Sequence, residues 1–165
     1  MKKRREVSRL YKLIVMTTSQ HLQAAYIEAR TRLSQVTDSI TESDLKKKLS
    51  VGPNSIGFLL QHIAEVELLF CKNVFGHAEV KVVAHTIIDQ KDTGVWIDIQ
   101  SIQSLLNESG ETIASVIANL SEDDWVTQIT TKEFGTKTKA EAFGRIISHT
   151  AYHAGQVAMI QKYGL

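Results

Sequence analysis

His149 and His153 stand four residues apart in the C-terminal segment TKAEAFGRIISHTAYHAGQVAMIQKYGL, residues 138–165. Side chains at positions i and i+4 of a helix lie on the same side, so the two imidazoles can reach one metal ion if this segment is helical. Gln156 falls beside them. Two nitrogen ligands leave a metal site incomplete, so a third ligand must come from elsewhere in the chain.

The same helix face carries apolar residues, which indicates that it points at least partly into a core. Its other members are Ala142, Ile146 and Ile160, together with Arg145, a basic exception that offers a contact for an anion. An unpartnered polar ring is costly in such a place. The alternative is that both histidines are solvated or bonded to a neighbouring carboxylate, which is common for histidines on amphipathic helices.

His62 is the candidate for the third ligand. It lies in a strongly apolar segment, and its neighbours on a helical wheel are Phe58, Leu59, Val66 and Leu69. The imidazole therefore points into a hydrophobic stripe, with Glu65 on the flank three residues later. The alternative is a core histidine that bonds to a backbone carbonyl or to Glu65.

Three imidazoles of this kind would make a metal centre with chemistry available to it. They bind a borderline divalent metal and leave at least one coordination position for water or substrate. A bound water or thiol loses its proton readily, which prepares a hydroxide or a thiolate nucleophile. A tetrahedral site suits Zn²⁺ and a six-coordinate site suits Ni²⁺. Glu65 and Gln156 could orient an imidazole or bond the bound water, with Glu65 as a possible general base, or could simply be solvated.

Four helices are predicted to position these residues. Apolar residues at helical spacing predict helices over about 7–36, 55–74, 99–120 and 138–163. Asn54 or Ser55 caps the second helix, and Thr138 forms a capping box with Glu141 at the start of the last one. Gly110 weakens the third helix and allows a close approach. The sequence thus predicts an all-α fold of four helices with one or two long connections.

The connections are harder to interpret. Residues 41–45 and 121–125 have the pattern of capped turns, and residues 126–138 predict a loop or a small hairpin around Gly135. The segment 75–98 contains KVVAHTI, which has the composition of a strand but could equally be a crossover loop on the helices. His77 and His85 lie in this segment and are left out of the predicted site. His21 is expected to be exposed or hydrogen-bonded.

The composition restricts the classes of partner. A chain of 165 residues fits one domain, 1–165, and its net charge of +1 gives no electrostatic reason to expect binding to nucleic acid or to an anionic membrane. No uninterrupted apolar run is long enough to span a membrane. The single cysteine, Cys71, suits a reducing compartment and is expected to be a small buried hydrophobe. We therefore expect a cytoplasmic protein.

Two segments of this sequence resemble the DinB/YfiT-like superfamily of metalloenzymes. They are NSIGFLLQHIAEVE around His62 and, after a long interval, RIISHTAYHAGQVAMIQKYG. The most specific part is H-x-x-x-H-x-G-Q, here His149, His153, Gly155 and Gln156. The helix order and the position of the connections are also similar, so the resemblance spans most of the chain.

The resemblance implies a four-helix bundle with up-down-down-up topology and long crossover connections. It also implies a divalent metal held by His62, His149 and His153, and a homodimer. Relatives include thiol-dependent transferases and isomerases that use bacillithiol, mycothiol or glutathione, whereas many other members have no known reaction.

The leading functional hypothesis is therefore a metal-dependent enzyme that activates a low-molecular-weight thiol and transfers it to an electrophilic small molecule. A metal-dependent hydrolase that uses bound hydroxide is the alternative among enzymes. A non-catalytic, metal-stabilised dimeric bundle is the alternative outside them, and a bundle of core histidines without metal is the simplest one.

Overall fold

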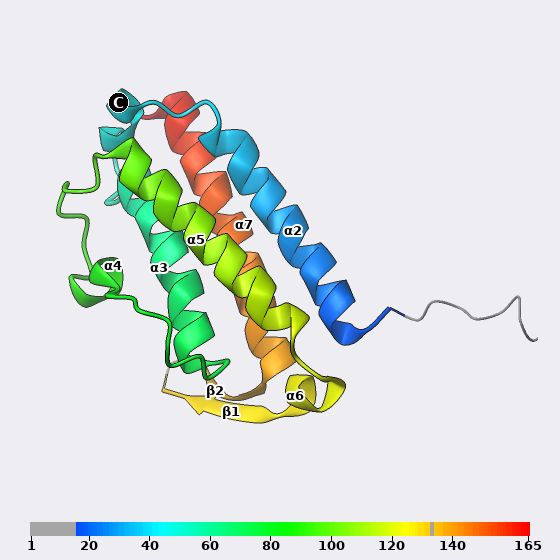
Figure 1. The fold of residues 1–165 in the computed structure, drawn as a ribbon. Helices are drawn as coiled ribbons and strands as arrows, with labels where there is room; N and C mark the ends of the chain where they lie inside the picture. Colours follow the sequence, from blue (N-terminus) through cyan, green and yellow to red (C-terminus); the bar gives the residue numbers. More distant parts are fainter. Residues whose placement is uncertain (1–15, 133) are drawn as a thin grey trace, which may run out of the picture.

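The computed structural model describes residues 16–132 and 134–165, which are mostly helical. Four long helices lie side by side (Figure 1). They are α2 (Thr18–Thr37), α3 (Ile56–Asn73), α5 (Ile99–Ala118) and α7 (Lys139–Tyr163). Helices α2 and α7 run in one direction and α3 and α5 run in the other (Figure 1). The prediction of a mainly α-helical chain is confirmed.

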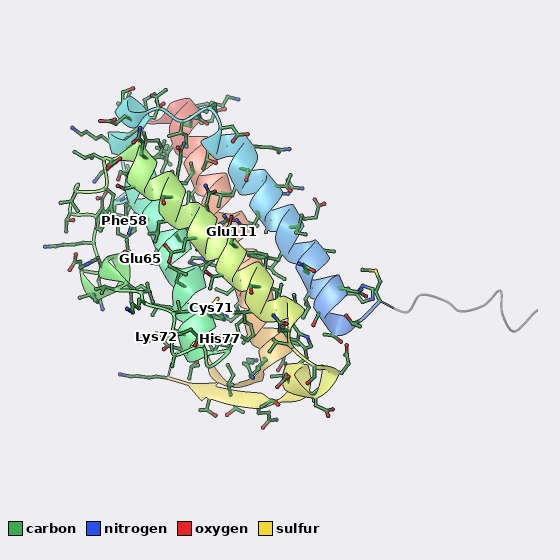
Figure 2. The ribbon with its side chains drawn as sticks, viewed as in Figure 1. Phe58, Glu65, Cys71, Lys72, His77 and Glu111 are labelled. Atoms are coloured by element: carbon green, nitrogen blue, oxygen red, sulfur yellow. The ribbon has the colours of Figure 1, made fainter. Side chains whose placement is uncertain are left out.

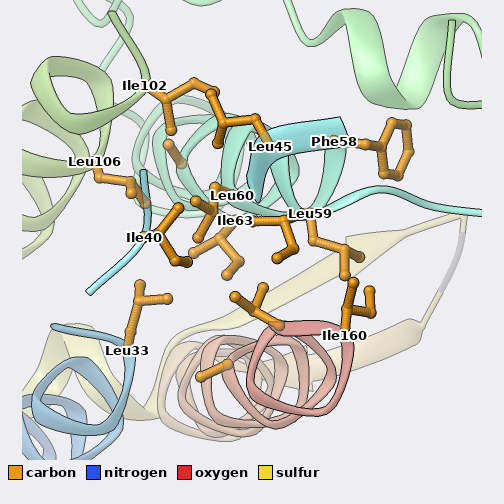
Figure 3. Close-up of a cluster of buried hydrophobic side chains, with 14 residues drawn as sticks. Leu33, Ile40, Leu45, Phe58, Leu59, Leu60, Ile63, Ile102, Leu106 and Ile160 are labelled. Atoms are coloured by element: carbon orange, nitrogen blue, oxygen red, sulfur yellow. The ribbon is translucent and has the colours of Figure 1, made fainter. Parts of the chain in front are cut away.

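The helices pack in a closed arrangement in which α3 contacts α5 and α7, and α2 contacts α7 and α5. One cluster of buried side chains joins all four, with Leu33 from α2, Leu60 from α3, Leu106 from α5 and Ile160 from α7 (Figure 3). A second cluster lies toward the other end and contains Tyr26, Trp125 and Phe143. Burial of each large apolar side chain contributes roughly 1.5–3 kcal/mol. The fold therefore rests on the apolar stripes that the sequence shows.

The first long helix begins later than its sequence pattern predicts. Thr17 has an extended backbone and its side chain accepts a hydrogen bond from the amide of Gln20, while Gln20 reaches back to the amide of Thr17. This reciprocal capping box fixes the start of α2 at Thr18, because it satisfies amides that have no partner inside the helix. The predicted helix from about residue 7 includes residues 16–17, which are not helical, so the prediction is wrong there. Residues 7–15 lie outside the described residues.

The other three long helices begin where the sequence predicts. The Ser55 hydroxyl accepts from the amide of Phe58 at 3.2 Å, and Thr138 forms the expected capping box with Glu141. Asp98 caps α5 by accepting from the amides of Gln100 and Ser101. These caps set the register of α3 and α7, and therefore the direction in which their histidines point.

Short elements connect the long helices. They are a 3₁₀ turn η1 (Glu42–Lys46), the short helices α4 (His85–Ile88) and α6 (Glu122–Val126), and an antiparallel hairpin of β1 (Gln128–Thr131) and β2 (Gly135–Thr138). The predicted turns and the small hairpin are confirmed. The strand alternative for KVVAHTI is wrong, because this stretch lies in a crossover whose regular element is α4. One isolated strand would have had no neighbour to pair with.

The crossover between α3 and α5 is held against the N-terminus of α3. The Asp92 carboxylate accepts from the amide of Ser55 at 2.8 Å and pairs with the ammonium of Lys48 at 2.9 Å. Gly57 lies directly under the backbone of Trp96, since a Cβ atom at Gly57 would stand 1.9 Å from the Trp96 carbonyl oxygen. The crossover therefore packs on α3 more closely than a larger residue at position 57 would allow.

A buried polar network crosses the four helices. Glu67 of α3 is fully buried, and its carboxylate accepts from Arg30 of α2 at 2.9 Å, Ser109 of α5 at 2.7 Å and Thr150 of α7 at 2.9 Å. Gly110 admits the guanidinium, because a Cβ atom there would lie 2.6 Å from the Arg30 Nη2 atom. The close approach predicted at Gly110 is therefore present.

Cys71 is fully buried, as predicted, and burial raises the pKa of its thiol to about 12. Among the described residues, no helix is long and apolar enough to cross a membrane.

Candidate metal centre

The three predicted histidines come together from two helices. One potential ligand atom from each of His62 on α3 and His149 and His153 on α7 lies within 4.8 Å of the other two. The ring centroids are 5.0 Å apart for His62 and His149, 5.1 Å for His62 and His153, and 4.4 Å for His149 and His153. Residues 87 positions apart in sequence thus form one cluster.

The spacing of the nitrogens fits a metal ion. The Nε2 atoms of His62 and His149 are 3.1 Å apart. Two nitrogens at normal distances from a tetrahedral zinc ion stand about 3.3 Å apart. The observed separation is therefore close to what two ligands of one ion require.

His62 is held by a chain of two hydrogen bonds. Its Nδ1 atom lies 3.0 Å from the hydroxyl of Thr86, and this hydroxyl donates to the carboxylate of Glu65. Glu65 also accepts from the amide of Thr86 at 2.9 Å and from the side chain of Gln61 at 2.9 Å. With His62 Nδ1 engaged in this way, its Nε2 faces His149.

Glu65 is more deeply placed than its sequence position suggests. It was expected on the flank of the stripe, yet it is 1% exposed. Figure 2 shows Glu65 on α3, the helix that also carries Phe58. Within residues 16–132 and 134–165, no lysine or arginine forms an ion pair with it. The alternative of a solvated Glu65 is thus wrong, and its carboxylate reaches His62 only through Thr86.

His153 has its own partner. Its Nδ1 atom lies 2.6 Å from Oε1 of Gln156, whose amide nitrogen donates to the hydroxyl of Tyr152 at 3.1 Å. Because Gln156 uses its oxygen toward the ring, His153 carries a proton on Nδ1 and presents Nε2 without one. Gln156 therefore contacts the cluster as its sequence spacing predicts.

Burial keeps the three rings neutral. Burial first, and then the nearby His153, lower the pKa of His62 to about 4 and that of His149 to about 3. Burial also lowers the pKa of His153. Metal ions bind neutral imidazole, so this environment favours the form that a ligand needs. The Nδ1 atom of His149 is buried and has no hydrogen-bond partner in the described part of the chain.

Aromatic side chains border the cluster. Phe58 stacks on His62 with ring centroids 5.8 Å apart, and Trp96 meets Phe58 edge-on at 5.3 Å. Tyr152 lies 5.0 Å from His153 and is 63% exposed. The buried side of the site is therefore apolar, whereas Tyr152 marks the side that faces solvent.

The comparison with family models agrees with the resemblance seen in the sequence. The model of the DinB superfamily matches residues 25–157, a range that includes all three histidines. The chain belongs to the DinB superfamily. The comparison with curated proteins gave no significant match.

The remaining histidines of this DinB protein do not join the cluster. His77 pairs with Glu79 at 2.8 Å, and neither it nor the exposed His21 and His85 belongs to a group of metal-binding geometry. Arg145, a predicted anion contact, is exposed and lies over the ring of Phe134 at 3.9 Å. Among the described residues, His77 and His85 thus lie outside the cluster, and His21 is exposed, as the sequence predicts.

Two surface hollows of this DinB protein lie apart from the histidines. One of about 660 Å³ is lined by His77, Glu79, Glu108, Glu111 and neighbouring residues of the crossover and α5. The other, of about 210 Å³, lies between α2 and α5 beside Arg30. Neither hollow is lined by a histidine of the cluster, so the volume of a hollow does not indicate where the candidate metal centre lies.

Proposed function

We propose that this DinB protein is a metal-dependent enzyme in which His62, His149 and His153 hold one divalent metal ion, with Zn²⁺ expected ahead of Ni²⁺. The observation that carries the proposal is the convergence of three potential ligand atoms within 4.8 Å. The donor set supports it, because neutral imidazoles bind these metals well and three of them leave a position for an exchangeable ligand.

The bound metal would supply a Lewis acid that lowers the pKa of a thiol or a water at the open position. Around it, Gln156 orients His153 and the Phe58 ring excludes water from one face of His62. The buried carboxylate of Glu65, linked to His62 through Thr86, would offset one of the two positive charges of such an ion. A monoanion at the open position would offset the other, which favours a thiolate or hydroxide over a neutral ligand.

Within this class, we propose transfer of a low-molecular-weight thiol to an electrophilic small molecule. The thiolate sulfur attacks an electrophilic carbon, a sulfur–carbon bond forms, and the bond from that carbon to its leaving group breaks. The apolar wall of Phe58 and Trp96 supports a substrate with an apolar body.

A thiol panel tests this reaction. Metal-loaded protein is assayed with bacillithiol, mycothiol or glutathione and an electrophile such as an aryl halide or an epoxide, beside the variants His153→Ala and His21→Ala. We expect thiol-dependent turnover that His153→Ala loses and that the exposed-site variant His21→Ala keeps. Ester or amide cleavage without thiol would assign the hydrolase reaction instead. No turnover with any thiol on a loaded protein would contradict the transferase proposal.

The proposal extends to the topology of the helices. The helix directions in Figure 1 support the up-down-down-up four-helix bundle of the family.

We propose a homodimer, supported by the exposed side chains of Tyr152, Met159 and Tyr163, which recur at helical spacing along α7. Sedimentation at several concentrations tests it, and a monomer throughout would contradict it. The single buried Cys71 supports a cytoplasmic location.

A further inference from the structure

We propose that Thr86 is a positioning residue of the metal centre and that, through it, the short helix α4 of the crossover belongs to the site. Its hydroxyl links the imidazole of His62 to the buried carboxylate of Glu65. This inference rests on the proposed metal site and adds a residue that the histidine motif does not contain.

The direction of the hydrogen bonds follows from the chemistry of the three groups. An ionised carboxylate only accepts, so the single hydroxyl proton of Thr86 is directed to Glu65. The Thr86 oxygen can then only accept from the ring, and His62 must carry its proton on Nδ1. The lone pair of His62 is thereby placed on Nε2, the atom that lies 3.1 Å from Nε2 of His149.

Thr86 is also fixed in place independently of His62. It is 3% exposed, and its amide donates to the same carboxylate oxygen of Glu65 at 2.9 Å. Two bonds from one residue to one carboxylate hold the start of α4 against α3. The backbone of Thr86 is therefore already fixed when its hydroxyl contacts the ring. Less conformational entropy is lost when the His62 side chain is held in the orientation that binds a metal.

The arrangement would connect a buried negative charge to an ion bound by His62. Glu65 has three donors and no cationic partner in the described parts of the chain. A charge buried in this way is costly unless an opposite charge lies close. The carboxylate, the hydroxyl and the imidazole form a continuous path, so a divalent ion on His62 would supply the compensating charge. Removing the hydroxyl breaks the path without removing a ligand.

The test uses Thr86→Val, which keeps the shape and loses the hydroxyl, and Thr86→Ser, which keeps the hydroxyl. The matched control is Ser109→Ala, because Ser109 is also buried and donates to a buried glutamate of α3 but does not contact a histidine of the cluster. Zn²⁺ affinity is measured by competition with a chromogenic chelator. The tautomer of His62 in metal-free protein is measured from ring ¹⁵N chemical shifts.

We expect Thr86→Val to weaken Zn²⁺ binding about 10- to 100-fold, as loss of a partner of a ligating histidine does elsewhere, while Thr86→Ser and Ser109→Ala stay within about threefold of wild type. In metal-free wild type and Thr86→Ser, His62 should be protonated on Nδ1.

Three results would overturn the inference. Unchanged affinity in Thr86→Val would remove the role of Thr86 and leave the metal site standing. An Nε2-protonated His62 in the metal-free wild type would do the same, even if Thr86→Val does not fold. A wild type that binds no metal would overturn both this inference and the proposed function. His153→Ala separates this outcome from weak binding, because removing a ligand lowers the affinity of a weak site and changes nothing where no site exists.

Discussion

Each histidine of the cluster meets a different local environment, although all three rings are neutral. His62 is bonded to Thr86 and His153 to Gln156, whereas Nδ1 of His149 has no partner among the described residues. Ligating histidines usually donate their second nitrogen to an acceptor, which orients the ring and raises its basicity. The affinity of the site should therefore depend on residues beyond the three ligands.

Replacing Gln156 with Leu removes the acceptor of His153 and should weaken metal binding about 10-fold, because the ring then loses its fixed orientation. Chelator competition measures the change. Gln161→Leu is the control, since Gln161 lies on the same helix and bonds to Ser39 instead of a histidine. Equal losses in the two variants would indicate a general effect on α7 rather than an effect on His153.

The stability of metal-free protein should fall as the pH drops from 6.5 toward 5. The pKa values of His62 and His149 are lowered to about 4 and about 3, so the unfolded chain takes up protons in this range and the folded chain does not. Their contribution is complete above pH 6.5 and is lost as the pH approaches the folded pKa values. Denaturant titrations at pH 7 and pH 5 measure the loss.

The carboxyl groups whose pKa values are lowered by folding act below this window. The pKa values of Asp44, Asp92 and Glu141 are lowered in the folded state, so their contributions disappear only below the ordinary carboxyl range of about 4. The variant His149→Gln is the control and should show a shallower pH dependence. An equally steep dependence in this variant would assign the effect to other groups.

At the scale of the elements, the N-terminal ends of α3 and α7 could be predicted because local hydrogen bonds determine where these helices begin. Ser55, and Thr138 with Glu141, satisfy helix amides three residues away, which a sequence displays directly. The start of α2 was missed although Thr17 and Gln20 have the same spacing, since the absence of glycine and proline upstream suggested a longer helix. Here the capping box was the stronger signal.

The crossover was not predictable for a different reason. Thr86 meets Glu65 across 21 positions and His62 across 24, and no periodic pattern connects a single hydroxyl to partners at that distance. KVVAHTI has the composition of a strand, but tertiary contacts with α3 determine its conformation. The ligands could thus be predicted from helix periodicity, whereas the residues that hold them depend on tertiary structure.

Gly57→Ala should destabilise the fold by roughly 1–3 kcal/mol, because the added methyl group would stand 1.9 Å from a backbone oxygen of Trp96 that no side-chain rotation can move. Denaturant unfolding measures the change. Gly144→Ala is the control, since a Cβ atom there meets nothing within 4 Å, and it should stabilise the helix by up to about 1 kcal/mol. A neutral Gly57→Ala would show that the crossover is free to shift.

For the molecule as a whole, the network around Glu67 joins all four long helices at a buried charge. Arg30→Met should cost roughly 3–5 kcal/mol of unfolding free energy, because it leaves the Glu67 carboxylate without its cation. Calorimetry and denaturant unfolding measure the loss.

Two further variants separate the network from general charge effects. The double variant Arg30→Met with Glu67→Met should recover most of the loss, since it removes the uncompensated charge as well. Lys47→Met breaks a surface pair with Asp44 and should change stability by about 0.5 kcal/mol or less. A loss in Lys47→Met as large as that in Arg30→Met would contradict a special role for the buried network.

The most direct test of the account is the metal content of tag-free protein by elemental mass spectrometry, for wild type, His62→Ala, His153→Ala and the exposed-histidine control His21→Ala. The account predicts close to one Zn²⁺ or Ni²⁺ per chain in wild type and in His21→Ala, and loss of the metal in both of the other variants. Such a result would establish that α3 and α7 share one site. A wild type that carries no metal and takes up neither ion on addition would contradict the metal centre.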